Sequence, residues 1–343
     1  MVLGNGRVTM KAAFLELEER WAKENQLDPE GMVVCSSGTA ALHLALEVIR
    51  EKGRAKEARV LLSEYTMIAC ARAITLAGLE PCFVDCRPDT LLIDLGLVRD
   101  ISSRGDIVMP VHVYGRTVDM ERLTEIANEK DLFIVEDLAE AHSIKPHPDT
   151  DAACWSFYKN KVVAGEEGGA VYFRDKGGAA YARSLRSLGF TEAHDFFHVP
   201  RGHNYRMSNA HALLILAHMY FVKMNLSLRR YVEGAYDKAC PKPWRNPARE
   251  VPWVYDLRIP GLGADRLAQV VKALNAEGIE ARQGFKAMSL QREYAPPDYL
   301  RTHKTNAELA SEEVFYLPIT PLMQIENVAS RSFEIIRGIV PSP

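Results

Sequence analysis

The sequence predicts an α/β fold, with a large domain built on a mostly parallel sheet covered by helices and a smaller α+β domain after it. Short apolar runs alternate with amphipathic helical patterns over the first half of the chain, which is typical of successive βαβ crossovers. This alternation stops after about residue 207. The chain has 343 residues, more than one hydrophobic core usually organises. We therefore expect a large domain at 1–235 and a small domain at 236–343.

The elements of the large domain follow from the spacing of apolar residues. Phe14, Leu17 and Trp21 recur at helical spacing, with charged residues between them. Helices are expected on this basis at 10–25, 40–49, 67–77 and 120–130. Strands are expected in the short apolar runs at 32–34, 60–63, 81–85, 106–113 and 132–135. Right-handed crossovers would pair these strands in parallel and bring their carboxyl ends to one edge of the sheet.

The second half begins with a longer helix. Ser208 is a suitable N-cap for a helix that continues through Val222. The segment 241–252 holds four prolines and no apolar periodicity, which indicates a linker or a domain crossing. A small unit follows, with a strand at 254–259, a helix at 265–277 and a strand at 279–282.

The composition argues against several classes of protein. The net charge is −3 with both signs intermixed, so we expect no basic surface for nucleic acid. No apolar run has the length of a membrane span, and the first residues lack the pattern of a signal peptide. The six cysteines include no C-x-x-C pair and no nearby histidine at zinc-ligand spacing, so no metal site is expected. These observations favour a cytoplasmic protein that binds neither nucleic acid nor membranes.

A turn at 36–39, with the sequence Ser-Ser-Gly-Thr, lies between an expected strand and an expected helix. Free backbone N–H groups and the positive end of the helix dipole meet there, so the turn is suited to a phosphate. Gly38 allows close approach of the backbone, and Thr39 adds a hydroxyl donor. A simple helix cap is the alternative interpretation.

Two acids, Glu136 and Asp137, follow the apolar strand at 132–135. Ligands of open α/β sheets bind outside the carboxyl ends of the strands. An ionised acid held beside a pyridine nitrogen keeps that nitrogen protonated and makes the ring a better electron sink. The alternative is an N-cap for a helix at 138–142. His142 is either a residue of the same pocket or a buried structural histidine.

The stretch 156–169 combines aromatic residues, two lysines and a glycine-rich turn. Desolvation in such surroundings lowers the pKa of a lysine toward the neutral amine that attacks carbonyl groups, which makes Lys161 a candidate nucleophile. Surface charge is the alternative for Lys161 and for Lys159. Further along, Asn-Tyr-Arg-Met at 204–207 precedes the long helix, and taken alone it is better explained by packing at the helix entry.

Taken in order, these motifs resemble the sugar aminotransferases of the DegT/DnrJ/StrS type, a family of fold-type-I pyridoxal-phosphate enzymes. The resemblance covers nearly the whole chain. Its central motifs are Ser-Gly-Thr-Ala-Ala-Leu at 37–42, Val-His-Val-Tyr-Gly at 111–115, Glu-Asp-Leu-Ala-Glu-Ala-His at 136–142, Asn-Lys at 160–161, Glu-Gly-Gly at 167–169 and Asn-Tyr-Arg-Met at 204–207. Further matches lie at 65–66, 78, 83–85, 156–158, 312–313, 317–318 and 321–322.

The resemblance implies catalytic roles for two residues. It implies that Lys161 forms a Schiff base with pyridoxal 5'-phosphate and moves a proton during amino transfer. Asp137 corresponds to the partner of the pyridinium nitrogen. Glu140 stands near the phenolic oxygen of the cofactor, where the family usually has Gln.

The resemblance also implies a phosphate site. Gly38, Thr39 and Ser156 correspond to phosphate-binding positions. Asn204 corresponds to a residue that reaches the phosphate from the neighbouring subunit, which implies a homodimer with shared active sites.

Several positions depart from the family pattern. Met67 is expected to contact the cofactor, but the family commonly has an aromatic ring there. Glu166 stands where a Gly usually precedes Glu-Gly-Gly, and Ala-Met-Ser at 287–289 replaces Pro-Leu-His. The connection between His142 and Ser156 is short. The cofactor residues are thus kept while the residues expected around the acceptor differ.

The implied reaction is a ping-pong transfer of an amino group from glutamate or glutamine to a keto sugar, expected to be nucleotide-linked. Arg206 or Arg282 can pair with a donor carboxylate or a substrate phosphate, with surface arginine as the alternative for both. Three other functions remain open. They are a cofactor-bound regulatory protein without turnover, an enzyme for a cyclitol or modified base, and a sugar dehydratase, whose branch has His in place of the lysine.

Overall fold

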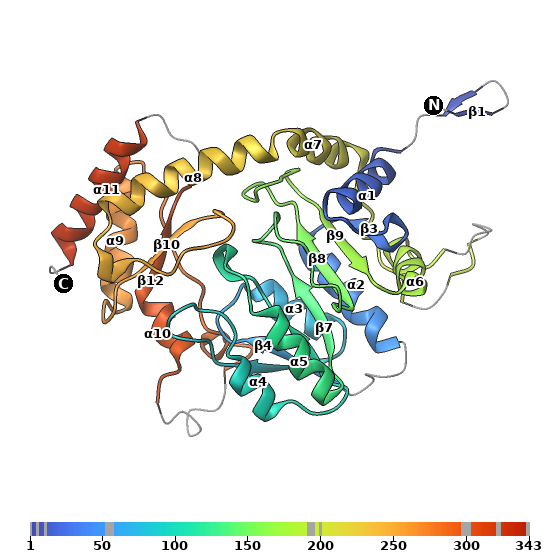
Figure 1. Cartoon of the computed structure of the whole chain (residues 1–343), viewed down its shortest axis with the longest axis horizontal. Helices are drawn as coiled ribbons and strands as arrows, with labels where there is room; N and C mark the ends of the chain where they lie inside the picture. Colours follow the sequence, from blue (N-terminus) through green and yellow to red (C-terminus); the bar gives the residue numbers. More distant parts are fainter. Residues whose placement is uncertain are drawn as a thin grey trace.

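The computed structural model describes residues 12–51, 58–190, 196–198, 201–295, 303–319 and 324–340, and the backbone of 2–4 and 7–9. The predicted motif at 321–322 lies outside these residues. The two N-terminal strands, β1 (Val2–Gly4) and β2 (Arg7–Thr9), pair antiparallel with each other. All other described strands belong to a large sheet or a small sheet (Figure 1).

The large sheet has seven strands in the order β3-β9-β8-β7-β6-β4-β5. They are β3 (Met32–Cys35), β4 (Arg59–Ser63), β5 (Glu80–Val84), β6 (Ile107–Met109), β7 (Phe133–Asp137), β8 (Ala152–Ser156) and β9 (Gly169–Phe173). Strands β5, β4, β6, β7 and β8 run parallel, while β9 is antiparallel to both β8 and β3. The predicted mostly parallel sheet is therefore present, and β8 and β9 extend it beyond the predicted strands.

Helices surround this sheet. They are α1 (Ala13–Glu24), α2 (Gly38–Ile49), α3 (Ile68–Leu76), α4 (Leu95–Ile101), α5 (Met120–Lys130) and α6 (Lys176–Arg186). Single-turn 3-10 helices lie at Pro29–Gly31, Val113–Gly115, Lys242–Trp244 and Met288–Leu290. The predicted strand at 106–113 is correct only for its first part. The strand ends at Met109, because Pro110 has no backbone N–H to donate to the sheet, and the chain then turns in the 3-10 helix at Val113–Gly115.

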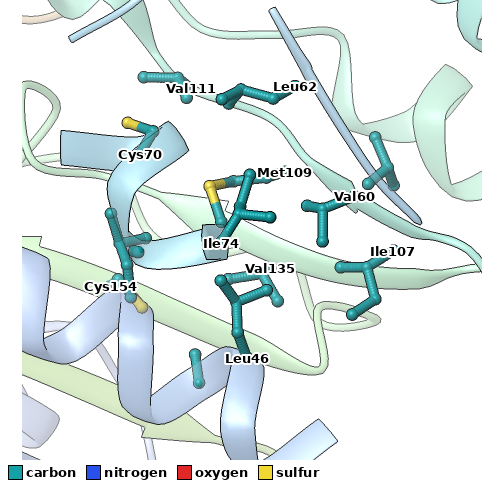
Figure 2. Close-up of a cluster of buried hydrophobic side chains, with 14 of the residues drawn as sticks. Leu46, Val60, Leu62, Cys70, Ile74, Ile107, Met109, Val111, Val135 and Cys154 are labelled. Atoms are coloured by element: carbon teal, nitrogen blue, oxygen red, sulfur yellow. The ribbon is translucent and has the colours of Figure 1, made fainter. Parts of the chain in front are cut away.

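Alternate residues of the central strands pack on opposite faces of the large sheet. Cys154 of β8 belongs to a core cluster with α2 and α3, in which Leu46, Ile74 and Val135 also lie (Figure 2). The next residue, Trp155, belongs to a second cluster with α1 and α7. Because strand side chains alternate between faces, both faces of this sheet are buried, as parallel sheets require.

The small sheet has three antiparallel strands in the order β10-β12-β11. They are β10 (Tyr255–Arg258), β11 (Arg282–Gln283) and β12 (Val314–Leu317). The accompanying helices are α9 (Ala264–Ala276), α10 (Asn306–Glu313) and α11 (Ile325–Ile339). The predicted strand at 279–282 is wrong except at its last residue. The amide side chain of Asn275 instead holds both backbone groups of Ala281, at 3.0 and 3.1 Å.

The predicted long helix is two helices, α7 (Asn209–Tyr220) and α8 (Val222–Ala239), which are bent by 66° relative to each other. Ser208 caps α7 as predicted, because its Oγ accepts the N–H of His211 at 3.2 Å. Figure 1 shows α8 running from α7 to the helices of the small sheet, so the expected boundary at residue 235 falls inside one helix. The division into two domains stays a prediction. No single helix in the described ranges is long and apolar enough to cross a membrane, and α7 with α8 meets that test only as a bent pair.

Candidate active site

A cavity of about 420 Å³ lies at the carboxyl ends of β7 and β8 and at the N-termini of α2 and α3. Among the residues that line it are the predicted Gly38, Thr39, Met67, Asp137, Glu140, Ser156, Lys161 and Arg282. Segments far apart in the sequence thus bring most of the predicted site residues together. Three predicted residues, His142, Asn204 and Arg206, are not part of the lining.

Asp137 is the last residue of β7, and its side chain is buried. One carboxylate oxygen accepts the N–H of Ala139 at 2.9 Å, and the other accepts the Sγ–H of Cys70 at 3.2 Å. Burial raises the pKa of this carboxyl, while these hydrogen bonds and the charge of Lys161 oppose the rise. No helix forms at 138–142, so the helix-cap alternative for Asp137 is wrong.

Lys161 follows β8 in the turn that leads to β9. Its side chain is only 11% exposed, so the surface-charge alternative does not apply to it, whereas Lys159 is exposed. The Nζ atom lies 3.8 Å from Oε1 of Glu140 and 4.0 Å from the centre of the Trp253 ring. Burial lowers the pKa of the Lys161 amine, against the opposing charges of Glu140 and Asp137. The surroundings therefore favour the neutral amine that nucleophilic attack requires.

Glu140 sits between the lysine and the turn at Tyr114. Its Oε2 accepts the backbone N–H of Tyr114 at 2.7 Å, while Oε1 faces Lys161. Burial raises the pKa of this carboxyl to about 7, even though Lys161 and the Tyr114 hydrogen bond favour the ionised form. Glu140 is thus an acid whose charge changes near neutral pH.

The first turn of α2 closes one side of the cavity. Ser37 caps the helix, because its Oγ accepts the N–H of Ala40 at 3.1 Å. A Cβ atom on Gly38 would lie 2.6 Å from the Cβ of Ser156, so only glycine lets α2 approach β8 this closely. The cap and the phosphate interpretations of this turn are compatible, since the first N–H groups of a helix have no partner within it.

Two departures from the family pattern have clear local structures. Met67 is 47% exposed at the start of α3, and its Sδ accepts the N–H of Ala69 at 3.1 Å. This position therefore offers a thioether and no aromatic ring to the cavity. Glu166 adopts a left-handed backbone with φ 66°, a conformation that glycine takes at lower cost. The turn thus keeps the left-handed backbone that suits glycine, although Glu166 occupies the position.

His142 is buried next to the cavity but does not open into it. Its Nε2 donates to the carbonyl of Ser156 at 2.8 Å, and its Nδ1 accepts the N–H of Val163 at 3.2 Å. Burial lowers the pKa of His142 to about 3, so the ring is neutral. Both nitrogens hold the loop that carries Lys161, which favours the structural interpretation of this histidine.

Asn204 and Arg206 are exposed, and the guanidinium of Arg206 donates to the side-chain oxygen of Asn204 at 3.2 Å. Arg282 does line the cavity, at its exposed rim, where it pairs with Glu280 at 2.6 Å. Of the two candidate arginines, only Arg282 is therefore placed to meet a ligand in the cavity of this chain.

Several lining residues were not predicted from the sequence. Trp253 covers Lys161 and donates its indole N–H to the carbonyl of Asn160 at 3.0 Å. Phe285 and Tyr316 reach the cavity from the small sheet and its flanking loop. Trp253 follows a proline-rich segment without periodicity. An aromatic residue in this irregular stretch was the only sequence feature that could have indicated a role in the site.

A buried lysine beside two buried acids, at the carboxyl edge of a mostly parallel sheet, defines an α/β enzyme site. A model of the DegT/DnrJ/EryC1/StrS aminotransferase family matches residues 1–331, and the chain belongs to this family. The predicted fold class and family are thereby confirmed. Aminotransferases of this family are pyridoxal-phosphate enzymes.

Two relatives and one solved structure illustrate the similarity. The chain is 34% identical to GDP-perosamine synthase from Caulobacter vibrioides, over 77% of this chain and 74% of that protein. It is 30% identical to dTDP-3-amino-3,4,6-trideoxy-alpha-D-glucose transaminase from Micromonospora megalomicea, over 99% of this chain and 92% of that protein. The crystal structure of DesV from S. venezuelae matches with a TM-score of 0.83 at 26% identity, over 97% of this chain and 91% of that chain.

Proposed function

We propose that this aminotransferase uses pyridoxal 5'-phosphate, bound covalently by Lys161, to move an amino group from glutamate or glutamine to a nucleotide-linked keto sugar. The observation that carries the proposal is the position of Lys161, which is desolvated, 3.8 Å from Glu140 and in the same cavity as Asp137. A lysine in such surroundings has a chemical use that a surface lysine lacks.

The residues of the cavity fit the cofactor. The N-terminus of α2, with the hydroxyls of Thr39 and Ser156 beside it, supplies donors for a phosphate group. Gly38 leaves room there, because a Cβ at this position would overlap Ser156. The carboxylate of Asp137 suits a protonated ring nitrogen, and the amine of Lys161 suits an aldehyde. When bound, pyridoxal phosphate supplies that aldehyde and a ring that withdraws electrons from the bonds being broken.

The chain's own residues then have distinct tasks. Lys161 would hold the cofactor covalently and, once a substrate amine had displaced it, its free amine would be the base that moves a proton between the substrate carbon and the cofactor. Asp137 stays ionised when it faces a cation, since an opposite charge offsets the effect of burial on its pKa. Trp253 covers Lys161 and separates this amine from bulk water. Glu140 accepts or donates a proton beside the amine near neutral pH.

The acceptor is inferred from the relatives. Two of them bear the names of enzymes that make amino sugars on GDP and dTDP carriers, which supports a nucleotide-linked keto sugar here. Arg282 at the rim of the cavity is suited to a carboxylate or phosphate, because a guanidinium binds such oxygens in pairs. To do so it must exchange its contact with Glu280 for the ligand.

We further propose that the active unit is a homodimer. Asn204 is exposed and lies outside the cavity of its own chain, which fits a residue that completes the phosphate site of a partner. The helices α7 and α8 that follow it, and the residue between them, expose large apolar side chains, namely Leu213, Leu214, Tyr220, Phe221, Met224 and Tyr231. Exposed apolar residues in one such region are typical of an interface between subunits.

The test of the proposal compares Lys161→Ala with Lys159→Ala, a matched control that removes the exposed lysine two residues away. Each protein is incubated with pyridoxal phosphate, reduced with borohydride and digested. The masses of its peptides are then measured by mass spectrometry. We expect the cofactor mass on the peptide with Lys161 in the wild type and in Lys159→Ala, and no such adduct in Lys161→Ala. Equal labelling of all three proteins would disprove the assignment of Lys161.

The amino donor and acceptor are tested on the same preparation. Glutamate and glutamine are expected to shift the visible absorbance of the bound cofactor, and a panel of keto sugar nucleotides is expected to reverse the shift. If only keto cyclitols reverse the shift, the acceptor is a cyclitol and not a nucleotide-linked sugar. If the cofactor binds but no donor changes its spectrum, the regulatory alternative replaces amino transfer.

A further inference from the structure

A second cluster of titratable side chains lies on the far part of α2, away from the cavity lining. His43 and Glu47 are one helical turn apart, so they share one face of α2. His203, from the segment before Asn204, completes the cluster. Nε2 of His203 lies 2.6 Å from Oε2 of Glu47, and Nε2 of His43 lies 3.8 Å from the same oxygen.

His43 contributes an unused ligand atom to this cluster. The residue is only 3% exposed, and its Nε2 has no hydrogen-bonding partner in the described part of the chain. Its other nitrogen, Nδ1, lies 3.0 Å from the hydroxyl of Tyr205. If Nδ1 donates its proton to that hydroxyl, Nε2 carries a free lone pair, 3.8 Å from Oε2 of Glu47. Leaving a buried polar atom without a partner is costly, so this nitrogen calls for an explanation.

The donor set matches a divalent transition ion. One ligand atom from each of the three side chains lies within 4.8 Å of the other two. Zinc bonds of about 2.0–2.2 Å in a tetrahedral site place the ligand atoms about 3.4 Å apart. His43 Nε2 lies 3.8 Å from Oε2 of Glu47, and the 2.6 Å hydrogen bond from His203 to the same oxygen would open to that spacing when an ion takes the place of its proton. Two imidazoles with one carboxylate are a recurring zinc set that leaves the fourth position for water.

The surroundings hold the ligands in a form that binds metal. Burial lowers the pKa of His43, against opposing effects of Glu47 and the Leu76 backbone, so the imidazole is favoured in its neutral form. Tyr205 supports both histidines, because its hydroxyl reaches His43 and its ring stacks on His203 at 4.8 Å. Contacts of this kind to the non-ligating parts of histidines orient them in metal sites. The side chain of His203 is 24% exposed, so an ion can reach the cluster from solvent.

We propose that His43, Glu47 and His203 form a binding site for Zn²⁺ or another divalent first-row transition ion. The bound ion joins α2, whose first turn carries Gly38 and Thr39, to the segment that carries Asn204. Arg50 does not compete with the ion for the ligand oxygen, because it faces the other oxygen of Glu47, at 3.9 Å. This metal site does not depend on the proposed amino transfer, so either proposal can be disproved without affecting the other.

The test uses the full chain without cofactor, dialysed against a chelator. Zn²⁺ is titrated in competition with a chromophoric chelator, and Co²⁺ is added as a visible-absorbance probe. We expect one ion per chain, a Co²⁺ spectrum characteristic of nitrogen and oxygen ligands, and a thermal midpoint that rises with metal concentration. His43→Asn, Glu47→Gln and His203→Asn should each weaken binding at least tenfold.

His218→Asn is the matched control, since it removes an exposed histidine outside the cluster and should leave the affinity unchanged. His203→Asn is the decisive variant because its ring is partly exposed, and its fold is checked by circular dichroism. The proposal is overturned if the wild type binds less than one ion per chain. It is equally overturned if folded His203→Asn and Glu47→Gln bind metal as tightly as the wild type.

Discussion

Glu140 makes the stability of the protein without cofactor depend on pH in a way that a single substitution can isolate. Its carboxyl is buried, and its pKa is raised from 4.5 to about 7. The unfolded chain releases the proton of Glu140 near pH 4.5, while the folded protein keeps it until about pH 7. The folded state therefore holds more protons in this window, and the free energy of unfolding falls as pH rises through it.

The size of the effect follows from the difference between the two pKa values. A carboxyl with a pKa of 4.5 in the unfolded chain and about 7 in the folded protein costs the folded state about 3 kcal/mol once it is ionised in both. Glu140→Gln removes this cost and keeps an oxygen that can accept the N–H of Tyr114. The stability of the variant minus that of the wild type should rise by about 3 kcal/mol between pH 4 and pH 8.

Urea unfolding of cofactor-free protein, at a fixed protein concentration and a series of pH values, measures this difference. Glu167→Gln is the control, because it removes an exposed carboxylate of the same cavity. Curves for Glu140→Gln and the wild type that stay parallel from pH 4 to pH 8 would refute the reasoning. Such a result would mean that Glu140 is ionised at no cost in the folded protein.

Three further substitutions test the architecture of the site. Gly38→Ala should weaken cofactor binding at least tenfold in a spectroscopic titration, because its Cβ would lie 2.6 Å from the Cβ of Ser156. Gly234→Ala in α8, where an added Cβ meets no atom within 4 Å, should bind the cofactor normally. Arg116→Met should lower the free energy of unfolding by about 2 kcal/mol in urea, because it removes one of the two buried guanidinium groups that bind Asp256, at 2.8 Å from both oxygens, and leaves Arg249 at 3.0 Å. Glu166→Gly should raise the thermal midpoint, with a gain of up to about 1 kcal/mol, because glycine tolerates φ 66°; a lower midpoint would contradict the left-handed assignment.

Helices and strands were predicted correctly where the apolar residues follow a single helical or strand spacing. Helix α5 has the predicted bounds of 120–130, and Ser208 caps α7 as expected, because caps and amphipathic spacing are local properties of the chain. Predictions failed where a distant or side-chain contact replaces the local pattern. The strand expected at 279–282 is lost because Asn275 takes the backbone groups that a neighbouring strand would have used.

The same distinction applies to the site. Family-like motifs were enough to select Lys161, Asp137, Gly38 and Ser156, and parallel strands explain why their ends meet in one cavity. The contact between Trp253 and Lys161 could not be predicted in this way. Trp253 lies 92 residues further along the chain, and no local sequence pattern links it to the site. The cluster of His43, Glu47 and His203 was missed for the same reason, because only folding brings His203 beside α2.

The sequence by itself determined the alternating strands and helices and the family, and it predicted which lysine and acids lie in the site, since these depend on residue type and spacing along the chain. Tertiary structure decided how each of those groups ionises. Lys161 and Glu140 have shifted pKa values because residues from distant segments exclude water and place the two charges 3.8 Å apart. Desolvation depends on the whole surrounding shell, and no stretch of sequence contains that shell.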